Sequence, residues 1–97
     1  MTVLIHRRNS IAECFNERGL FRYKTIDFAE AIDDFSKAIE YDDQMSAAYY
    51  NRGLVNYRMS LFQKAVVDFE KAVFLDVNNR EFQLALNETH KALKESK

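Results

Sequence analysis

Apolar residues recur three or four positions apart along most of the chain, which is the spacing of one face of an amphipathic helix. The pattern divides the chain into helical segments joined by short turns. The predicted helices run from about Ile11 to Lys24, from near Asp27 to about Tyr41, from Ser46 to about Met59, from Leu61 to about Leu75 and from Arg80 to Lys97. We therefore expect an all-α protein.

Short polar side chains stand where the predicted helices begin. A side-chain oxygen at this position accepts a hydrogen bond from a backbone N–H of the first turn, which has no partner within the helix. Ser10 is followed three residues later by Glu13, which is the spacing of a capping box. The residues expected to cap or begin helices are Asn9 or Ser10, Asp27, Ser46 and Ser60.

The chain also contains two copies of one pattern. Residues 12–45 align with residues 46–79 without a gap, at a period of 34 residues, and 11 positions are identical. A fixed period of this size is typical of stacked helical repeats. The identical pairs are Arg18/Arg52, Gly19/Gly53, Leu20/Leu54, Tyr23/Tyr57, Phe28/Phe62, Ala31/Ala65, Asp34/Asp68, Phe35/Phe69, Lys37/Lys71, Ala38/Ala72 and Asp42/Asp76.

A glycine lies inside the first predicted helix of each copy. Gly19 and Gly53 interrupt sequences that otherwise favour helix, where glycine costs roughly 0.5 to 1 kcal/mol relative to alanine. The simplest requirement for a missing side chain is close approach of a partner helix. Small residues on that partner, such as Ala31 and Ala38, would allow two backbones to pack closely.

These features resemble the tetratricopeptide repeat, a pair of antiparallel helices of 34 residues. The resemblance implies a short α-solenoid, organised as one domain over residues 1–97 with repeats at 12–45 and 46–79. Residues 1–11 would form an N-terminal strap or helical turn, with a frayed tail as the alternative, and residues 80–97 a capping helix. The residues that carry the resemblance are Phe15 or Tyr49, Gly19 or Gly53, and Phe28, Ala31, Phe35 and Ala38 with Phe62, Ala65, Phe69 and Ala72.

Two kinds of position depart from the family pattern. The proline expected near the end of each repeat is replaced by Asp43 and Val77, and the glycine expected between paired helices by Ile26 and Ser60. The sequence therefore does not determine the geometry of the turns. The chain is also similar to the small proteins of this family that consist of repeats alone.

Composition favours a soluble protein of the cytoplasm or the nucleus. The chain is 47% apolar and 30% charged, and no stretch approaches the roughly 18 apolar residues of a membrane span. Residues 1–9 lack the apolar core and cleavage site of a signal peptide. The single cysteine, Cys14, excludes an internal disulfide, and we expect it to be buried by packing.

Acidic residues are concentrated in the first repeat. Residues 12–45 contain four Lys and Arg against nine Asp and Glu, which gives −5, although the whole chain carries only −1. We expect a solvated acidic face on the second helix, with a docking site for a basic ligand as the alternative. The residues expected to form this face are Glu30, Asp33, Asp34 and Glu40.

No catalytic, cofactor or metal motif is present in the sequence. A glycine-rich phosphate loop, a nucleophile elbow and a paired-histidine helix are all missing, and His6 and His90 have no companion ligands. A basic stripe with interleaved aromatic residues, typical of nucleic-acid binding, is missing too. We therefore expect a non-enzymatic protein that binds neither cofactor nor metal, nucleic acid or membrane.

These observations leave protein–protein interaction as the function that the sequence predicts. The resemblance implies that the first helix of each repeat lines a concave groove. Tyrosine and arginine suit a recognition surface because they combine contact area with polar groups. The groove residues would be Asn16, Leu20, Tyr23, Lys24, Tyr50, Asn51, Leu54, Tyr57 and Arg58, flanked by Glu13, Glu17 and Ala47. For Leu20, Tyr23 and Leu54, ordinary packing between repeats is the alternative.

Some members of the family hold the acidic tails of heat-shock chaperones in a two-carboxylate clamp. Asn51 matches one clamp asparagine, but Asn16 and Leu20 stand where a lysine and an asparagine are expected, and Glu81 and Ala85 replace a lysine and an arginine. Two carboxylates would be poorly held without these cations. We expect no tight binding of such tails.

Self-association is the second functional hypothesis. The chain has no proline, and both of its glycines lie inside predicted helices, so the turns lack the usual helix stop. The turn at residues 24–26 or the one at 42–45 could continue as helix and exchange elements between two chains. Two repeats are also fewer than the three or so that a stable stack usually needs. A domain-swapped homodimer is therefore the alternative.

Overall fold

The computed structural model describes residues 2–96, with side chains from Val3 onward, and confirms the all-α prediction. The helices are α1 (Thr2–Lys24), α2 (Phe28–Tyr41), α3 (Ser46–Arg58), α4 (Phe62–Leu75) and α5 (Arg80–Glu95), and this part of the chain contains no strand. Met1 and Lys97, which the sequence analysis assigned to the N-terminal strap and the last helix, lie outside the described residues.

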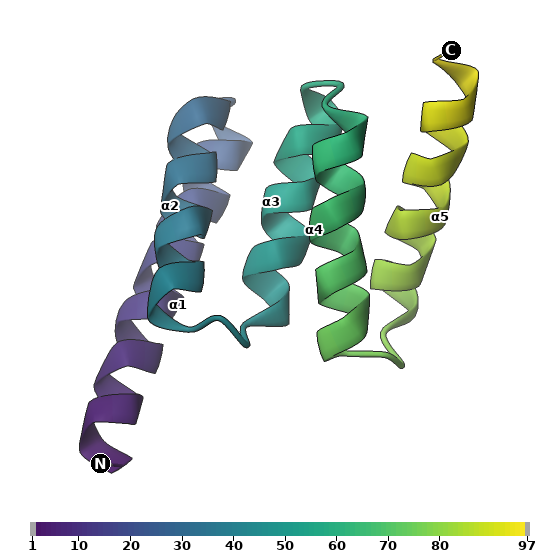
Figure 1. Ribbon diagram of the computed structural model, residues 1–97. Helices are drawn as coiled ribbons and strands as arrows, with labels where there is room; N and C mark the ends of the chain where they lie inside the picture. Colours follow the sequence, from purple (N-terminus) through teal and green to yellow (C-terminus); the bar gives the residue numbers. More distant parts are fainter. Residues whose placement is uncertain (1, 97) are drawn as a thin grey trace.

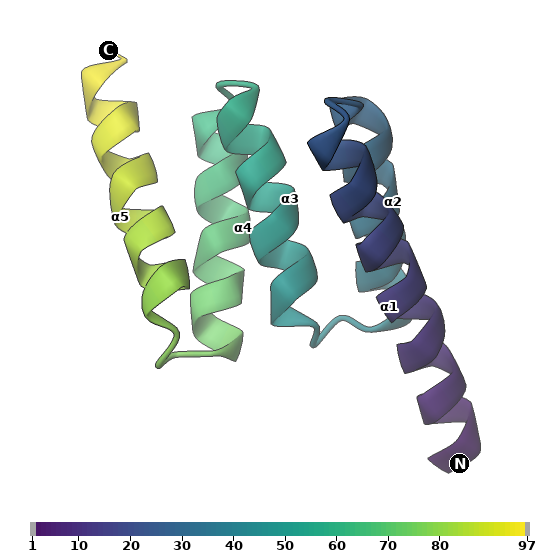
Figure 2. The same cartoon turned by 180° about the vertical axis from the view of Figure 1, so that it is seen from behind.

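The helices form two antiparallel hairpins and a fifth helix, arranged side by side (Figure 1). α1 pairs with α2 and α3 pairs with α4, while α2 packs on α3 and α4 packs on α5. In Figure 1 α2 and α4 lie in front of α1 and α3, and the view from behind in Figure 2 reverses this order. The molecule is therefore a slab of two helical layers, measuring 48 × 30 × 17 Å.

α1 is longer than the sequence analysis indicated. The prediction of a start near Ile11, capped by Asn9 or Ser10, was wrong, because the helix runs back without interruption to Thr2. Ser10 therefore lies inside a helix and caps nothing. The N-terminal turns of α1 project beyond the other helices (Figure 1), and residues 3–8 are exposed.

Each hairpin turns at a residue with left-handed backbone geometry. Ile26 has φ of 66° and Ser60 has φ of 62°, a conformation that glycine adopts most easily. After α1, the N–H of Asp27 donates to the carbonyl of Arg22 over 2.8 Å and the N–H of Ile26 to that of Tyr23 over 3.1 Å. This pair of bonds is the Schellman motif, which ends a helix by satisfying its last carbonyl groups.

The serines predicted to cap α3 and α4 do not do so. Ser60 belongs to the turn that ends α3, and the cap position of α4 is Leu61. Ser46 is the first residue of α3, and the cap position is Met45, without a side-chain capping bond. Asp27 does stand at the cap of α2, although its side chain makes no capping bond. Among the caps described, α5 has such a bond, in which the N–H of Phe82 donates to Asn79 Oδ1 over 3.1 Å.

The two glycines lie where an aromatic ring of the partner helix meets the backbone. A Cβ on Gly19 would stand 2.6 Å from Phe35 Cε1, and a Cβ on Gly53 would stand 2.6 Å from Phe69 Cε1. Both rings are almost completely buried. The partner helix therefore does approach each glycine closely, but through an aromatic ring and not through the small residues Ala31 and Ala38 that the sequence analysis named.

The core consists of small residues and aromatic rings. Ala12, Ala38 and Ala48 form one buried cluster, with Phe15 and Tyr41 packed beside it. The rings of Phe15 and Tyr41 stack with centroids 5.8 Å apart. A second buried cluster, of Ala31, Phe35 and Val55, joins the two hairpins, with Leu20, Tyr23, Phe28 and Ile32 packed against it.

Candidate functional site

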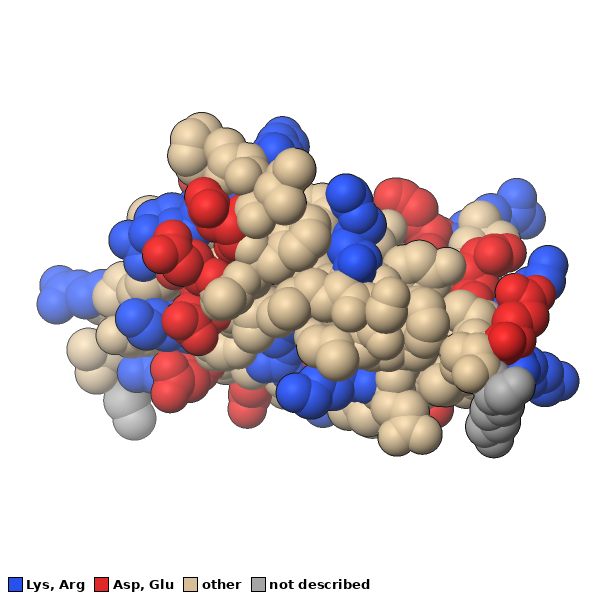
Figure 3. Space-filling view, turned by 90° about the horizontal axis from the view of Figure 1, so that it is seen from above, with Lys and Arg blue, Asp and Glu red and all other residues tan. Residues whose placement is uncertain are grey.

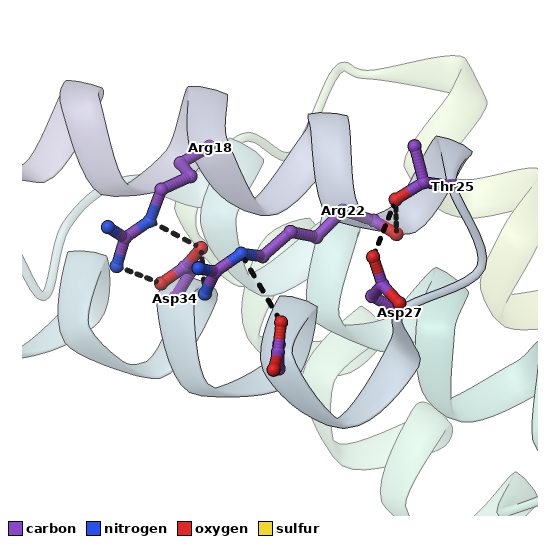
Figure 4. A network of polar contacts seen from close by, with 6 residues as sticks. Arg18, Arg22, Thr25, Asp27 and Asp34 are labelled. Atoms are coloured by element: carbon purple, nitrogen blue, oxygen red, sulfur yellow. Dashed lines mark hydrogen bonds and ion pairs between the residues drawn. The ribbon is translucent and has the colours of Figure 1, made fainter.

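An ion pair with a buried aspartate links the two helices of each hairpin. Arg18 on α1 donates through Nε and Nη2 to the two oxygens of Asp34 on α2, over 3.0 and 2.8 Å. Figure 4 shows Arg22, one turn further along α1, reaching the same carboxylate, 3.2 Å away. The prediction that Asp34 belongs to a solvated acidic face was wrong, because its side chain is 1% exposed and paired with two arginines.

The second hairpin repeats this arrangement with one substitution. Arg52 donates to both oxygens of Asp68 over 3.0 and 2.7 Å. At the position of Arg22, this repeat has Asn56, which donates to Asp68 Oδ2 over 3.1 Å. Arg52 also donates to Ser36 of the first hairpin over 3.1 Å. These charged groups therefore serve the scaffold, with no described buried side-chain polar atom left unpartnered.

The predicted groove residues lie on α1 and α3, the two helices on one side of the slab (Figure 2). Lys24 and Arg58 are exposed, and Asn51 is buried. The others are half-buried, so they contribute both to packing and to the surface. These half-buried residues are Asn16, Leu20, Tyr23, Tyr50, Leu54 and Tyr57.

Tyr50 packs into the end of the molecule that α5 closes. Its ring lies 4.7 Å from the ring of Phe82 on α5 and 5.7 Å from that of Phe69, between ring centroids. Burial raises the pKa of the Tyr50 hydroxyl above its ordinary value, and the nearby carboxylate of Glu81 raises it further. Tyr50 therefore remains neutral at physiological pH and joins α3 to α5.

Polar contacts tie the first and second repeats together across the groove. Asn51 Nδ2 donates to Asn16 Oδ1 over 3.0 Å. Arg58 Nη1 lies 3.4 Å from the hydroxyl of Tyr23, and the guanidinium stands over the rings of Tyr23 and Phe28 at 5.7 and 5.6 Å from their centroids. Both contacts span helices of different repeats, so they fix how the two repeats sit relative to one another.

A hollow of about 230 Å³ opens between α3 and α5. Leu54 and Tyr57 contribute one wall, and α5 contributes the other, where the sequence analysis identified Ala85 alone among the lining residues. The apolar pattern of residues 80–97 predicted the helix but not which of its side chains face α3. The residues that line the hollow are Leu54, Tyr57, Phe69, Ala85, Glu88 and Thr89.

A larger hollow, of about 590 Å³, lies between α2 and α4 on the other side of the slab. Its floor is the Arg52–Asp68 pair with Asn56, and its walls include Ile32, Met59 and Val67. The sequence analysis placed no site there. Asp33 and Lys64, both exposed, line the hollow too, so its surface combines apolar and charged side chains.

Acidic groups lie at both ends of the molecule. Figure 3 shows Asp and Glu, mixed with Lys and Arg, over the end where α1 and α2 lie and over the end where α5 lies, with a surface between them that is mostly uncharged. Glu30, Asp33 and Glu40 are all exposed on α2, as the sequence analysis expected. Cys14, however, is exposed on α1, so its predicted burial was wrong: the helix face that carries it has no packing partner among the described residues.

Neither a membrane span nor a metal site is found in residues 2–96. None of the helices there is long and apolar enough to span a bilayer. No group of three or more His, Cys, Asp or Glu side chains in this part of the chain is arranged to hold a metal ion.

With paired helices stacked in register and closed by a fifth, the protein is a short α-solenoid of helical hairpins. Comparison with solved structures identifies the type of helical repeat. The TPR domain of Arabidopsis OM64 superposes with a TM-score of 0.86 and 24% identity, covering 91% of this chain and 73% of that one. The protein thus has the tetratricopeptide-repeat fold, and the resemblance seen in the sequence is confirmed.

Two further structures of this fold contain bound peptides. The first TPR of Spaghetti (RPAP3), bound to the HSP90 peptide SRMEEVD, matches with a TM-score of 0.83 and 24% identity over 87% of this chain and 68% of that one. The second TPR domain of human RPAP3, in complex with the HSP70 peptide SGPTIEEVD, matches with a TM-score of 0.77 and 25% identity, covering 81% and 66%. Neither a scan against protein-family models nor a search of curated proteins found a match.

Proposed function

We propose that the protein is a non-enzymatic interaction module that binds a peptide or helical segment of another protein along α1, α3 and α5. The observation that carries the proposal is the hollow between α3 and α5, where Leu54 and Tyr57 meet Ala85. Its volume of about 230 Å³ suits one large apolar side chain, and apolar side chains seated in small pockets supply most of the affinity at such surfaces. Solved relatives of the same fold bind peptides.

The charged groups around the hollow indicate what should flank the anchoring side chain. Arg58 is exposed one helical turn from Leu54, and Glu88 lines the hollow on α5. A ligand with an apolar anchor, an acidic residue toward Arg58 and a basic or neutral residue toward Glu88 would match these charges.

This surface lacks the features of a two-carboxylate clamp. Asn51, the one residue that matches such a clamp, is buried and donates its amide to Asn16. On α5, Glu81 places a negative charge where the clamp requires a cation. Two adjacent carboxylates would meet repulsion instead of paired hydrogen bonds. We therefore propose that the ligand is held by its apolar side chain.

A displayed peptide library, panned on the wild-type protein, would test this proposal. Peptides that share an apolar anchor should be enriched, and fluorescence anisotropy should then show their affinity falling at least about tenfold for Leu54→Arg, which fills the hollow with a charge. Leu84→Arg is the matched control, because Leu84 is an exposed leucine on α5 that does not line the hollow. Helical circular dichroism should be unchanged for both variants.

The peptide SRMEEVD provides a second arm of the same titration. It should show no micromolar binding to the wild-type protein, because the cations that would hold its carboxylates are missing. Micromolar binding of this peptide would contradict the proposal that the surface lacks a carboxylate clamp. Enriched peptides that bind Leu54→Arg as well as they bind the wild type would contradict the hollow as the anchor site.

A further inference from the structure

One face of α1 carries a row of exposed residues that no other described helix covers. The row follows alternating steps of four and three positions, so its members lie within a narrow stripe along the helix. Val3 is 68% exposed at one end and Phe21 is 65% exposed at the other. The stripe, named the α1 outer stripe here, consists of Val3, Arg7, Ser10, Cys14, Glu17 and Phe21.

The internal repeat shows what kind of surface this stripe is. Thirty-four residues later, Ala48 corresponds to Cys14 and Val55 corresponds to Phe21. Both Ala48 and Val55 are 0% exposed, and they lie in the clusters by which α3 packs on the first hairpin. The α1 outer stripe is therefore a surface of the type that receives a helix, and within the described chain it receives none.

When two copies of the stripe are placed antiparallel, each residue faces one of matching size or opposite charge. If a second α1 lies antiparallel, with the twofold axis at the level of Ala12, then Val3 faces Phe21 of the other copy, and Ser10 faces Cys14. Arg7 then faces Glu17, and the twofold axis creates each pairing twice. Spacings of four and three residues are those of a two-helix seam, in which helix axes lie about 8–10 Å apart at a shallow angle.

The charges support the antiparallel register specifically. A parallel pairing would set Arg7 against Arg7 and Glu17 against Glu17, which is repulsive at both places. Neither residue makes an ion pair with another residue of the described chain. Both charges are thus available to an approaching helix.

We propose that the protein forms a twofold homodimer through the α1 outer stripe, with two α1 helices packed antiparallel. This inference does not depend on the hollow between α3 and α5, which no stripe residue lines, although Glu17 also flanks the predicted groove. The seam is a single pair of helices, each about 34 Å long at about 1.5 Å per residue. It is at the small end of specific interfaces, so the dimer is a reversible one that dissociates on dilution.

Charge reversal tests the register. By sedimentation across a concentration series, the wild type should pass from monomer to dimer as concentration rises. Arg7→Glu and Glu17→Arg should each raise the dissociation constant by at least about tenfold, because like charges then face each other twice. The double variant should recover the wild-type value, since each new charge again faces its opposite. Lys91→Glu, a charge reversal at an exposed site on α5, is the matched control and should change nothing.

Cysteine pairing tests the geometry independently. The wild type, with Cys14 alone, is mixed with a variant that carries both Ser10→Cys and Cys14→Ser, and the mixture is oxidised mildly. In the proposed register the cysteine introduced at position 10 of the variant faces Cys14 of the wild-type copy, whereas like cysteines are offset along the axis by about 6 Å. Disulfide-linked heterodimers should therefore exceed either homodimer.

Three results would overturn the proposal. A monomer that persists to several hundred micromolar shows that the stripe is not a dimer seam under any accessible condition. A dimer unaffected by Arg7→Glu and Glu17→Arg associates elsewhere, for instance by exchange of helices at a turn. Homodimer cross-links in excess of heterodimer ones indicate a parallel arrangement.

Discussion

Two residues in this protein hold a backbone conformation that their side chains disfavour. Ile26 and Ser60 end α1 and α3 with φ of 66° and 62°, at the position where helical hairpins commonly have glycine. For a residue with a branched Cβ this conformation is a genuine outlier, because the side chain crowds the following carbonyl. The Schellman hydrogen bonds formed there are strong enough, together with the packing of the hairpin, to offset this strain.

Ile26→Gly is accordingly expected to stabilise the protein. Relief of the left-handed strain contributes roughly 1–2 kcal/mol, and the added flexibility of glycine in the unfolded chain removes part of it, which leaves a net gain of about 1 kcal/mol. The side chain is 67% exposed, so little packing is lost. Urea denaturation monitored by circular dichroism would measure the gain as a higher midpoint at unchanged slope.

Lys24→Gly is the control for that measurement. Lys24 is the last residue of α1 and is exposed, so glycine there should reduce the free energy of unfolding by up to about 1 kcal/mol. If Ile26→Gly also lowers stability, the isoleucine side chain must contribute more through contact than its exposure indicates.

Asp34 shows which properties of a residue could be inferred from sequence and which could not. The 34-residue period marked Asp34 and Asp68 as equivalent, together with Arg18 and Arg52. It did not show that each aspartate meets an arginine across the hairpin, because that contact depends on how the two helices are rotated about their axes. The prediction that Cys14 is buried was wrong for a related reason, since its counterpart Ala48 is buried against α1 and α2, and no helix of residues 2–96 stands in the same relation to α1.

Helices were easier to predict than their ends. The interior of each helix follows from apolar spacing, which burial of one face imposes over several turns. Its first residue depends on local competition among backbone groups, and Ser10 and Ser60 looked like caps because serine favours that position. In the structure the helix passes through Ser10, and Ser60 belongs to the preceding turn.

The close contact between paired helices predicts the effect of a single methyl group. Gly19→Ala and Gly53→Ala should each reduce the free energy of unfolding by about 1–3 kcal/mol, because the new Cβ would stand 2.6 Å from a buried ring. This loss would occur although alanine is the better helix former by about 1 kcal/mol. Chemical denaturation of both variants would measure it.

A second substitution can separate the steric explanation from a general loss of order. Combining Gly19→Ala with Phe35→Leu, which removes the ring, should cost less than the sum of the two single changes. Asn87→Ala, at an exposed position of α5, introduces alanine without a neighbouring ring and should not destabilise. Strict additivity in the double variant would show that the glycine is required for another reason.

At the scale of the molecule, stability should be greatest in the middle of the stack. Among the described helices, α3 and α4 have neighbours on both sides, whereas α1 and α5 each have one side that no described helix covers. Val55 and Phe69, on the central helices, are almost fully buried, and residues 3–8 of α1 are exposed. In stacked repeats of this kind, local stability follows from the interfaces that each unit shares with its neighbours.

Hydrogen exchange at low protein concentration should reveal this gradient. Amides of residues 5–8 are expected to exchange fastest, and those around Val55 and Phe69 at least about tenfold more slowly than the ends, after correction for intrinsic rates. Raising the concentration should slow exchange in α1 selectively, because the proposed dimer covers it. Uniform protection along the chain would indicate one cooperative unit and contradict the gradient.

The groove was the part of the molecule that sequence described least completely. Its residues on α1 and α3 could be placed by their repeat positions, and that assignment stays a prediction until a ligand is bound. On α5 the resemblance assigned a groove position to Ala85, whereas Glu88 and Thr89, which line the same wall, were missed. α5 lies outside the two repeats, so the period assigns these two residues no position, and only packing shows that they face α3.

The contacts between successive helices also bear on how the protein folds during its synthesis. α2 packs on α1, α3 on α2, α4 on α3 and α5 on α4, so each helix after the first contacts the helix immediately before it, although α3 pairs most extensively with α4, which follows it. A ribosome releases the N-terminus first, and domains of this kind can begin to fold while synthesis continues. Every newly released helix therefore meets a helix that has already been made, and no part of the fold must wait for a distant downstream segment.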